Sequence, residues 1–261
     1  MSTLWQMIGA LVFAELAMTA LFLVQRKTQN AGIVDAGWSY GIGILAIAFA
    51  AMGQGDWARR VAAGGLAAVW GFRLGTYVLL HRVIGQPEEG RYQTIRETWP
   101  TVAVFAFFLL QGLLSFLFAL PVLVACANPA AWGWTDILAV LVWVASVGGE
   151  GLADKQLTAF KRDPSNAGQV CRTGLWRYSR HPNYFFEWIH WWAYVLFSLG
   201  HSLWWTTLAA PALMLFFLMK ITGIPPTEAQ ALRSRGEAYR KYQRTTSVFF
   251  PWFPKKTEEE S

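Results

Sequence analysis

Long apolar stretches alternate with short polar connections along this chain. Seven of these stretches are long enough to cross a hydrocarbon core of about 30 Å, which takes about 20 helical residues. A helix satisfies its own backbone hydrogen bonds, so such stretches are helical inside lipid. The pattern predicts an all-α, polytopic membrane protein, with residues 1–261 forming one integral membrane domain. The spans are expected near residues 4–24, 33–52, 61–81, 102–125, 132–149, 183–200 and 203–221.

The last part of the chain, residues 223–261, is polar and charged and is expected to form a tail outside the membrane. The run Ile224-Pro225-Pro226-Thr227-Glu228 predicts a turn, with Thr227 as the cap of a short helix over residues 228–243. Four aromatic residues between positions 249 and 253 are expected at the bilayer interface.

Composition supports the membrane class. Hydrophobic residues make up 54% of the chain and charged residues only 15%, whereas a soluble domain is about a quarter charged. Fifteen Trp and eighteen Phe are typical of aromatic belts at two interfaces. The net charge of +6 does not indicate a nucleic-acid partner, because the basic residues lie between the apolar stretches.

The basic residues predict an orientation. Nineteen of the twenty-two Lys and Arg lie in the first, third and fifth connections and in the tail together with Lys220 just before it, and the second connection has only Arg59 and Arg60. Positive charge favours the cytoplasmic side. We therefore expect an outside N-terminus, a cytoplasmic C-terminus and polar chemistry on the cytoplasmic side. The first apolar stretch has no basic region before it and no small-residue cleavage site, so it predicts a retained helix rather than a signal peptide.

Several familiar sites are not indicated. The sequence has no Gly-rich phosphate loop followed by Lys and Ser or Thr, no dinucleotide fingerprint after a strand and no nucleophile elbow. Its four His and two Cys, Cys126 and Cys171, lack metal-site spacing, so no metal is expected. Any nucleotide would be held by helices and loops.

The third predicted span carries Arg73, Tyr77 and His81 at positions i, i+4 and i+8, which share one helix face. An arginine within a span is expected to face a cavity or a partner. Such a cation would make the proton of the Tyr77 hydroxyl easier to share. Alternatively, Arg73 pairs with Glu15 or Asp35 and Tyr77 is a core aromatic residue.

Asp35 lies at the start of the second predicted span. Its carboxylate could cap the helix, which is the favoured interpretation for an isolated Asp, or act as an acid or hydrogen-bonding partner in a pocket. Gly37, Gly41 and Gly43 allow a neighbouring helix or a flat ligand to approach closely, and helix packing is favoured.

The segment Gly174–Trp188, GLWRYSRHPNYFFEW, joins a cationic loop to an apolar helix. Asn183 and Glu187 lie in the first turns of that helix, where polar groups are expensive and usually functional. Before it, Glu150 and Asp154 stand at i, i+4, where like charges repel, so a ligand hydroxyl or an arginine should offset them.

Arginines beside a helix amino terminus form an anion site suited to the phosphates of a nucleotide. Attraction to anionic lipid headgroups would also explain the arginines. It would not explain Asn183 and Glu187 within the helix or the acidic pair before it, so an internal nucleotide site is favoured.

On the segment Gly174–Trp188 and on TGIPPTEAQALRSRGEAYRKYQRTTSVFFPWFPKK at 222–256, the chain resembles the steroid 5-alpha-reductase family, in particular its bacterial membrane reductases of mostly unassigned substrate. The resemblance extends from about residue 70 to the end. The Arg-His-Pro-x-Tyr element is similar to one in sterol reductases and isoprenylcysteine carboxyl methyltransferases of the same superfamily.

The resemblance implies NADPH in a cytoplasm-facing cavity and hydride transfer to the beta carbon of an enone. A tyrosine one turn after an arginine hydrogen-bonds the carbonyl, and Arg73 and Tyr77 fit this pattern. The Gln-Glu pair of the eukaryotic members is replaced by Val34-Asp35, so Asp35 could stand for the Glu, whereas the Gln has no counterpart.

These considerations assign catalytic roles to Tyr77 and Asp35 and substrate contacts to Arg73 and Trp38. A lipophilic substrate is expected to enter from the bilayer, with membrane lipids as the other partners, in the bacterial inner membrane. The alternatives are an S-adenosylmethionine-dependent methyltransferase and a non-catalytic lipid-binding protein. The sequence does not name the substrate, choose between NADPH and NADH, or identify the arginine that meets the extra phosphate. It does not determine the oligomeric state either, and it is compatible with a monomer. The expected cofactor contacts are Asp154, Arg172, Tyr178, Arg180, His181, Asn183, Tyr184, Glu187 and Tyr239.

Overall fold

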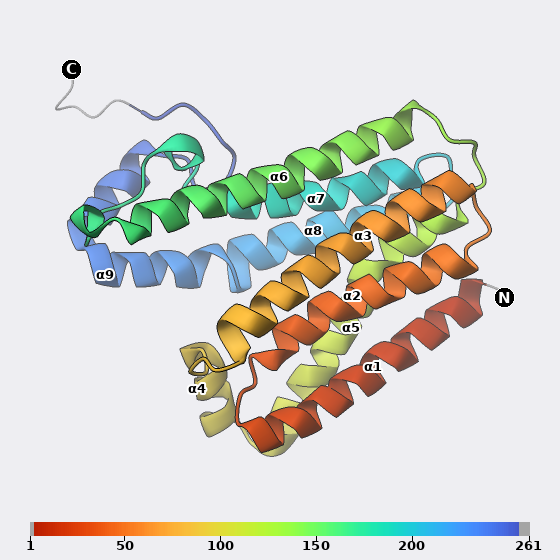
Figure 1. Ribbon diagram of the computed structural model, residues 1–261, viewed down its shortest axis with the longest axis horizontal. Coiled ribbons are helices and arrows are strands. Elements are labelled where there is room, and N and C mark those ends of the chain that lie inside the picture. Colours follow the sequence, from red (N-terminus) through yellow and green to blue (C-terminus); the bar gives the residue numbers. More distant parts are fainter. Residues whose placement is uncertain (1–2, 256–261) are drawn as a thin grey trace. The chain divides into compact units, whose positions relative to one another are not determined.

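A computed structural model describes residues 3–255, and the final six residues of the predicted tail lie outside that range. The described residues form helices and loops without strands (Figure 1), so the all-α prediction is confirmed. The chain forms two compact units. Unit 1 comprises Met1–Asp136 and Phe197–Thr207, and unit 2 comprises Ile137–Leu196 and Leu208–Ser261.

Six helices among the described residues are long and apolar enough to cross a membrane, so the chain is an integral membrane protein. The sequence predicted seven spans. The stretch expected at 183–200 forms α7, Pro182–Ser198, whose 17 residues extend about 25 Å, less than a hydrocarbon core of about 30 Å. The six are α1 (Thr3–Thr28), α2 (Ile33–Met52), Trp57–Val83 formed by α3 (Trp57–Val78) with the π-helical turn η1 (Leu79–Val83), α5 (Thr101–Ala127), α6 (Trp134–Arg162) and the composite stretch Trp204–Thr245.

In unit 1, α2 packs against α1, α3 and α5 through small residues. A Cβ atom on Gly37 would lie 2.1 Å from the Leu21 side chain of α1, and one on Gly71 of α3 would lie 2.6 Å from the Ser39 carbonyl oxygen. Glycine allows these close approaches between membrane helices. The packing role predicted for Gly37 is therefore confirmed.

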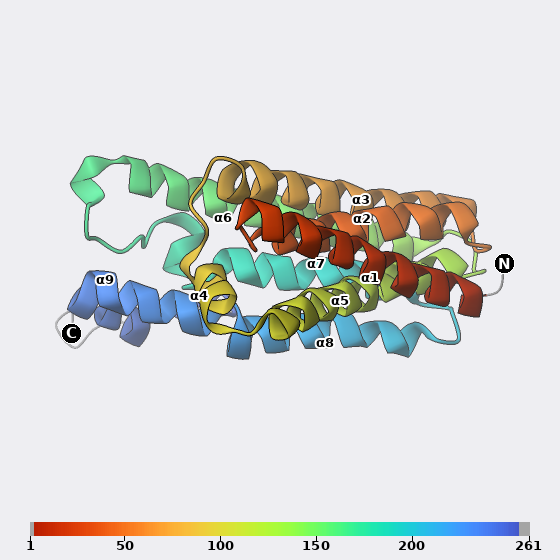
Figure 2. The ribbon, with the colours of Figure 1, turned by 90° about the horizontal axis from the view of Figure 1, so that it is seen from below.

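The two ends of the unit 1 bundle differ in chemistry. One end carries exposed tryptophans at the starts of α1, α3 and α6 and in the short helix η4, Trp204–Leu208. The other end carries arginines and lysines at the end of α1, in η1 and in α4, Gly90–Thr98, which lies at the start of α5 (Figure 2). Trp residues concentrate at membrane interfaces. The tryptophans are Trp5, Trp57, Trp132, Trp134, Trp204 and Trp205.

Unit 2 contains most of α6, the turns η2 (Pro164–Asn166) and η3 (Gly174–Arg177), α7, α8 (Ala209–Phe216), the π-helical turn η5 (Phe217–Ile221) and α9 (Ile224–Thr245). The cap predicted at Thr227 is wrong: α9 begins earlier, with Gly223 as N-cap and prolines at its first positions, where a missing N–H costs little. The Thr227 hydroxyl instead donates to the Gly223 carbonyl oxygen at 2.8 Å.

Candidate functional site

The segment that begins at Gly174 is fastened to α6. Gly174 has φ of 58°, and a Cβ there would lie 2.4 Å from the Gln156 side chain, so both conformation and space favour glycine. The Gln156 side chain accepts a hydrogen bond from the Leu175 amide at 2.9 Å, and the Trp176 indole donates to the Ala153 carbonyl oxygen at 2.9 Å. The cationic loop therefore starts from a defined position on α6.

Glu228 of α9 is the centre of a polar cluster that also contains Arg180, His181, Tyr239 and Gln243. Its carboxylate accepts hydrogen bonds from Arg180 Nε at 2.7 Å and His181 Nε2 at 3.2 Å. Gln243 Nε2 donates to its other oxygen at 2.8 Å, and the Tyr239 hydroxyl lies at 3.3 Å. We call this the Glu228 cluster. It joins the loop before α7 to both halves of α9.

The Glu228 cluster engages much of the predicted cofactor set. The Arg180 side chain is only 11% exposed, and its Nη1 donates to the carbonyl oxygens of Gln243 and Thr246, both at 2.9 Å. The buried His181 ring stacks on Tyr184 at 5.4 Å, and the Tyr184 hydroxyl lies 3.2 Å from Thr227 Oγ1. These groups hold the loop to α9, so an added phosphate would have to compete with Glu228.

The chain beyond α9 returns to the same loop. Ser179 Oγ donates to the Phe249 carbonyl oxygen at 2.8 Å, and the Arg180 amide donates to the Ser247 carbonyl oxygen at 2.8 Å. The Trp252 amide donates to the carbonyl oxygen of Tyr178, another predicted cofactor contact, at 2.9 Å. The tail is therefore part of the scaffold around Arg180.

Asp154 and Asn183 form a separate polar group on α6 and α7, and Glu187 lies one turn after Asn183 on α7. Asn183 Nδ2 donates to Asp154 Oδ1 at 3.2 Å, which helps to offset the repulsion expected between Asp154 and Glu150. Asp154 is exposed, and Asn183 and Glu187 are half-buried. These carboxylate and amide groups have the chemistry to bind ligand hydroxyl groups.

Two other arginines of the loop differ from Arg180. Arg172 has a long 3.4 Å contact to the Ala238 carbonyl oxygen, and its guanidinium lies 5.4 Å from the centre of the Tyr242 ring. Arg177 is exposed and makes no ion pair with any described residue. Both guanidinium groups are therefore more accessible to a phosphate than that of Arg180.

In unit 1, Tyr77 lies on the last turn of α3, where the helix widens into η1. Its ring stacks on His81, with centroids 4.7 Å apart, and its side chain is 51% exposed. The hydroxyl makes no hydrogen bond with another described residue, so it can donate to a ligand. Arg73 is exposed one turn earlier.

Asp35 is bound by two residues of α4. Arg91 Nη2 lies 2.9 Å from its carboxylate, and the hydroxyl of the buried Tyr92 donates to it at 2.6 Å. Burial, together with the Asp35 charge, raises the pKa of Tyr92 above its usual value, so this phenol remains a donor. The capping interpretation is wrong, because Gly32 is the N-cap of α2 and no side chain caps it.

Trp38 lies in the aromatic core of unit 1. Its ring meets Trp70 of α3 edge-on at 5.8 Å and Phe118 of α5 edge-on at 5.6 Å. Packing against two other helices therefore accounts for this residue, which the sequence assigned to the substrate.

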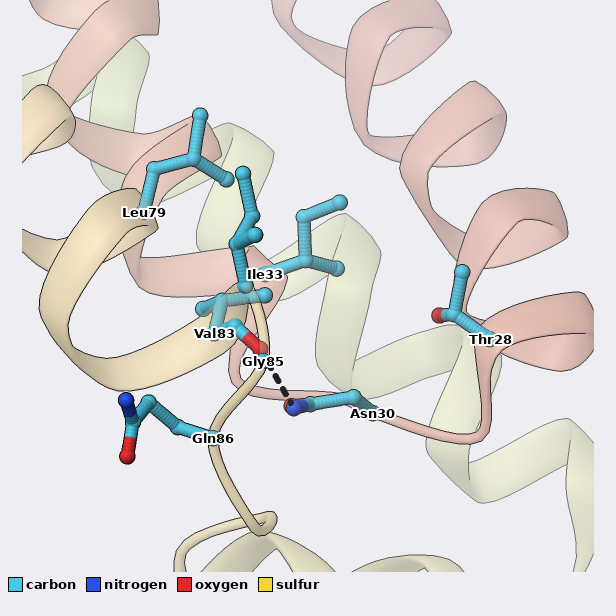
Figure 3. A pocket seen from close by; sticks show the side chains of 8 residues that line it. Thr28, Asn30, Ile33, Leu79, Val83, Gly85 and Gln86 are labelled. Atoms are coloured by element: carbon cyan, nitrogen blue, oxygen red, sulfur yellow. Dashed lines mark hydrogen bonds between the residues drawn. The ribbon is translucent and has the colours of Figure 1, made fainter.

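A pocket of about 500 Å³ opens in unit 1 between the turn joining α1 to α2 and the residues of η1 and the loop after it (Figure 3). Its walls combine aliphatic side chains with uncharged polar ones. The lining residues are Thr28, Asn30, Ile33, Leu79, Val83, Ile84, Gly85 and Gln86.

The structure divides the predicted residues between the two units. In unit 2 it joins Arg180, His181 and Tyr239 through Glu228 and joins Asn183 to Asp154, whereas Asp35, Trp38 and Tyr77 of unit 1 each have other partners. Asp35, Trp38, Arg73 and Tyr77 belong to unit 1, and the nine expected cofactor contacts belong to unit 2. Sequence reasoning missed Glu228, Gln243, Arg91 and Tyr92 as partners. The only local signal was the position of Glu228, an acidic residue directly after the Pro-Pro turn of a basic tail.

Six candidate spans and polar side chains gathered at helix ends define a polytopic helical membrane protein. The chain belongs to the family described as "Protein of unknown function (DUF1295)", whose model matches residues 21–246. No curated protein and no solved structure matches the chain.

Replacing Glu228 by alanine should destabilise the protein by about 2–3 kcal/mol, because Arg180 and His181 would lose a charged hydrogen-bond partner in a poorly solvated position. Thermal unfolding in detergent measures the effect. Glu237→Ala is the matched control, because its partners Arg240 and Arg244 are exposed, and no measurable change is expected. Equal unfolding temperatures for the two variants would contradict a stabilising role for the cluster.

Proposed function

We propose that this protein is a membrane reductase that transfers a hydride from NADPH to a carbon–carbon double bond conjugated to a carbonyl in a steroid-like or other lipid. The family resemblance of the segment Gly174–Trp188 suggests the reaction. One structural observation supports it most: the Glu228 cluster holds this segment against α9, while Asp154, Asn183 and Arg177 lie outside the cluster. The segment thus has both a scaffold and accessible polar groups.

The chemistry of these groups fits NADPH, whose phosphates are anions and whose riboses carry hydroxyl groups. Arg172 and Arg177 have guanidinium groups suited to phosphate. Asp154 and Asn183 can bind ribose hydroxyls. NADPH, when bound, supplies the hydride. Arg180 and His181 position the loop through Glu228 and do not need to touch the cofactor.

Tyr77 is the proposed donor to the substrate carbonyl. Negative charge develops on that oxygen during hydride transfer, and a preorganised donor stabilises it. Its hydroxyl has no other partner among the described residues, and Arg73, one turn away, adds positive charge. Asp35 has a different task in this proposal: its contacts with Arg91 and Tyr92 hold α4 against α2.

The proposed location is the bacterial inner membrane, with the N-terminus outside and the C-terminus in the cytoplasm. Termini on opposite sides require an odd number of spans, so this orientation includes α7 as a seventh span, whose 17 residues are at the lower end of the range of about 17–25 residues for a transmembrane helix. The distribution of residues at the two ends of unit 1 supports this orientation, because the basic end would face the cytoplasm. Of the two basic residues in the second connection, Arg59 is paired with Asp136, and Arg60 binds the carbonyl oxygens of Ala50 and Ala51. The charge of Arg59 is therefore compensated by a carboxylate, which leaves the positive charge of Arg60 in this connection.

Thermal shift in detergent tests the cofactor. NADPH should stabilise the protein, because Arg172 and Arg177 are proposed to bind its phosphates. S-adenosylmethionine has no phosphate and should not stabilise the protein. Stabilisation by S-adenosylmethionine alone would favour the methyltransferase that shares the Arg-His-Pro-Asn-Tyr element. Stabilisation by neither would favour a non-catalytic lipid-binding protein.

Arg177→Ser should weaken NADPH binding about tenfold, equal to about 1.4 kcal/mol, because an exposed guanidinium of the loop would be lost. Affinity for NADH should change much less if Arg177 meets the extra phosphate. Titration of nucleotide fluorescence gives both affinities. Arg162→Ser, at the exposed end of α6, is the control and should bind both nucleotides normally. Parallel losses for NADPH and NADH would remove Arg177 from the extra phosphate.

A further inference from the structure

We propose that the unit 1 pocket between the α1–α2 turn and η1 binds the carbonyl end of an uncharged, largely apolar ligand, with the Asn30 amide as hydrogen-bond donor. The inference rests on the proposed function only for the choice of a ketone as probe. The pocket itself belongs wholly to unit 1.

The walls of the pocket define the ligand class. Ile33, Leu79, Val83 and Ile84 supply aliphatic surface, and no Asp, Glu, Lys or Arg lines the space (Figure 3). Its volume of about 500 Å³ is within the range of small-molecule sites, about 300–1,000 Å³. Sites of this kind bind an apolar body and orient it with a few polar groups.

The two carboxylates near the pocket are already paired. Asp35 binds Arg91 at 2.9 Å. Glu88 binds Arg96 Nε at 3.0 Å through one oxygen and accepts from the Ala31 amide at 2.6 Å through the other. Because both carboxylates are already bound to arginines and the lining carries no charged side chain, a charged ligand would lose its hydration without gaining a partner in the pocket. The surroundings therefore favour a neutral ligand.

Asn30 is the polar group best placed to recognise that ligand. It is buried, and its Oδ1 accepts a hydrogen bond from the Gly32 amide at 3.0 Å, which orients the side chain. Its Nδ2 reaches the Val83 carbonyl oxygen at only 3.5 Å (Figure 3), beyond the usual range of about 2.7–3.2 Å. An amide nitrogen has two hydrogens to donate, so it can bind a ligand carbonyl.

The turn that carries Asn30 is fixed by residues outside the pocket. Gln29, just before Asn30, has φ of 54°, a conformation that is uncommon for a residue other than glycine. Its side chain accepts a hydrogen bond from Arg96 Nη1 at 2.8 Å, and Arg96 also binds Glu88. This connection between α4 and the turn fixes the position of Asn30 in the ligand-free protein. A preformed donor of this kind suits recognition of a carbonyl group.

Photolabelling in vesicles without NADPH tests the proposal. The probe is a photoreactive steroid enone, compared with the same steroid carrying a carboxylate and with a photoreactive phospholipid. The neutral enone should label the peptides containing Asn30 or residues 79–86, and the carboxylate form should label them at least tenfold less. Equal labelling by the two steroids, labelling elsewhere, or labelling by the phospholipid alone would each overturn the proposal.

Two variants identify the site. Asn30→Asp keeps the acceptor for the Gly32 amide but replaces the donor by a negative charge, and it should lower labelling at least tenfold. Leu79→Trp should do the same by filling the pocket. Gln54→Glu, in the exposed loop before α3, and Ile44→Trp, on the exposed face of α2, are matched controls and should label normally. If both pocket variants label like their controls, the site is elsewhere.

The result is separable from the proposed reaction. Labelling that depends on Asn30, together with no NADPH binding, would reject the reductase and keep the pocket. NADPH-dependent turnover, together with undiminished labelling of both pocket variants, would support the reductase and reject the pocket.

Discussion

Asp136→Asn is expected to destabilise the protein by about 3–5 kcal/mol, because it removes the charge that compensates a buried arginine. The side chains of Arg59 and Asp136 are 2% and 0% exposed, and Arg59 Nη2 lies 2.7 Å from Asp136 Oδ2. Arg59 Nε donates to the other carboxylate oxygen of Asp136, and the remaining guanidinium hydrogens bind the carbonyl oxygens of Asn128, Ala130 and Ala131. This arrangement connects the start of α3 to the start of α6, so its loss should loosen that end of unit 1.

Thermal unfolding in detergent measures the change. Asp56→Asn is the matched control, because Asp56 caps α3 by accepting from the Arg59 amide at 3.1 Å, and asparagine caps a helix about as well. The double variant Arg59→Met/Asp136→Leu should recover much of the lost stability, since apolar residues can replace a buried ion pair. A parent-like unfolding temperature for Asp136→Asn would show that the pair contributes little.

Tyr77→Phe is expected to lower turnover of an enone by about 100- to 1,000-fold, the usual effect of removing one donor to a developing oxyanion. Affinity for NADPH should stay nearly unchanged, because the Tyr77 hydroxyl is proposed to bind the substrate carbonyl and is not one of the proposed nucleotide contacts. The phenyl ring can still stack on His81, so the end of α3 should keep its conformation.

Single-turnover NADPH oxidation with a steroid enone gives the rate, and nucleotide fluorescence gives the affinity. Tyr40→Phe is the matched control, because its hydroxyl lies 2.9 Å from Thr76 Oγ1, next to Tyr77 in the sequence. Its rate should stay within about threefold of the parent, since the loss of an exposed hydrogen bond has a small effect. A fully active Tyr77→Phe enzyme would reject the proposed donor.

Most helices could be predicted because their signal is local. The apolar stretches of α1, α2, α3 and α5 are long, and the predicted ranges lie within or close to the observed ones. The span predicted at 183–200 is the informative difference. Its sequence is apolar, but Pro182 starts the helix and it ends at Ser198, which leaves α7 with 17 residues. The hydropathy pattern predicted this helix to within two residues at each end, but its 17 residues are at the lower end of the range of about 17–25 residues for a transmembrane helix.

The polar residues were more difficult to assign. Arg180 and His181 looked like ligands for a phosphate because their nearest neighbours in the sequence are also cationic. Their partner, Glu228, lies 48 and 47 residues away in the sequence, after α7, η4, α8 and η5. In the same way, Asp35 looked like a helix cap until α4 supplied Arg91 and Tyr92 from 56 and 57 residues away.

The amino-acid sequence alone was enough to determine the membrane class, the positions of most helices and the glycine at the α1–α2 contact. Each depends on hydrophobic length or side-chain size within one stretch of chain. Only the tertiary structure decided which charged side chains form ion pairs with one another and which stay accessible to a ligand. Arg59 and Asp136 meet across 77 residues, and that meeting depends on how whole helices pack rather than on any local pattern.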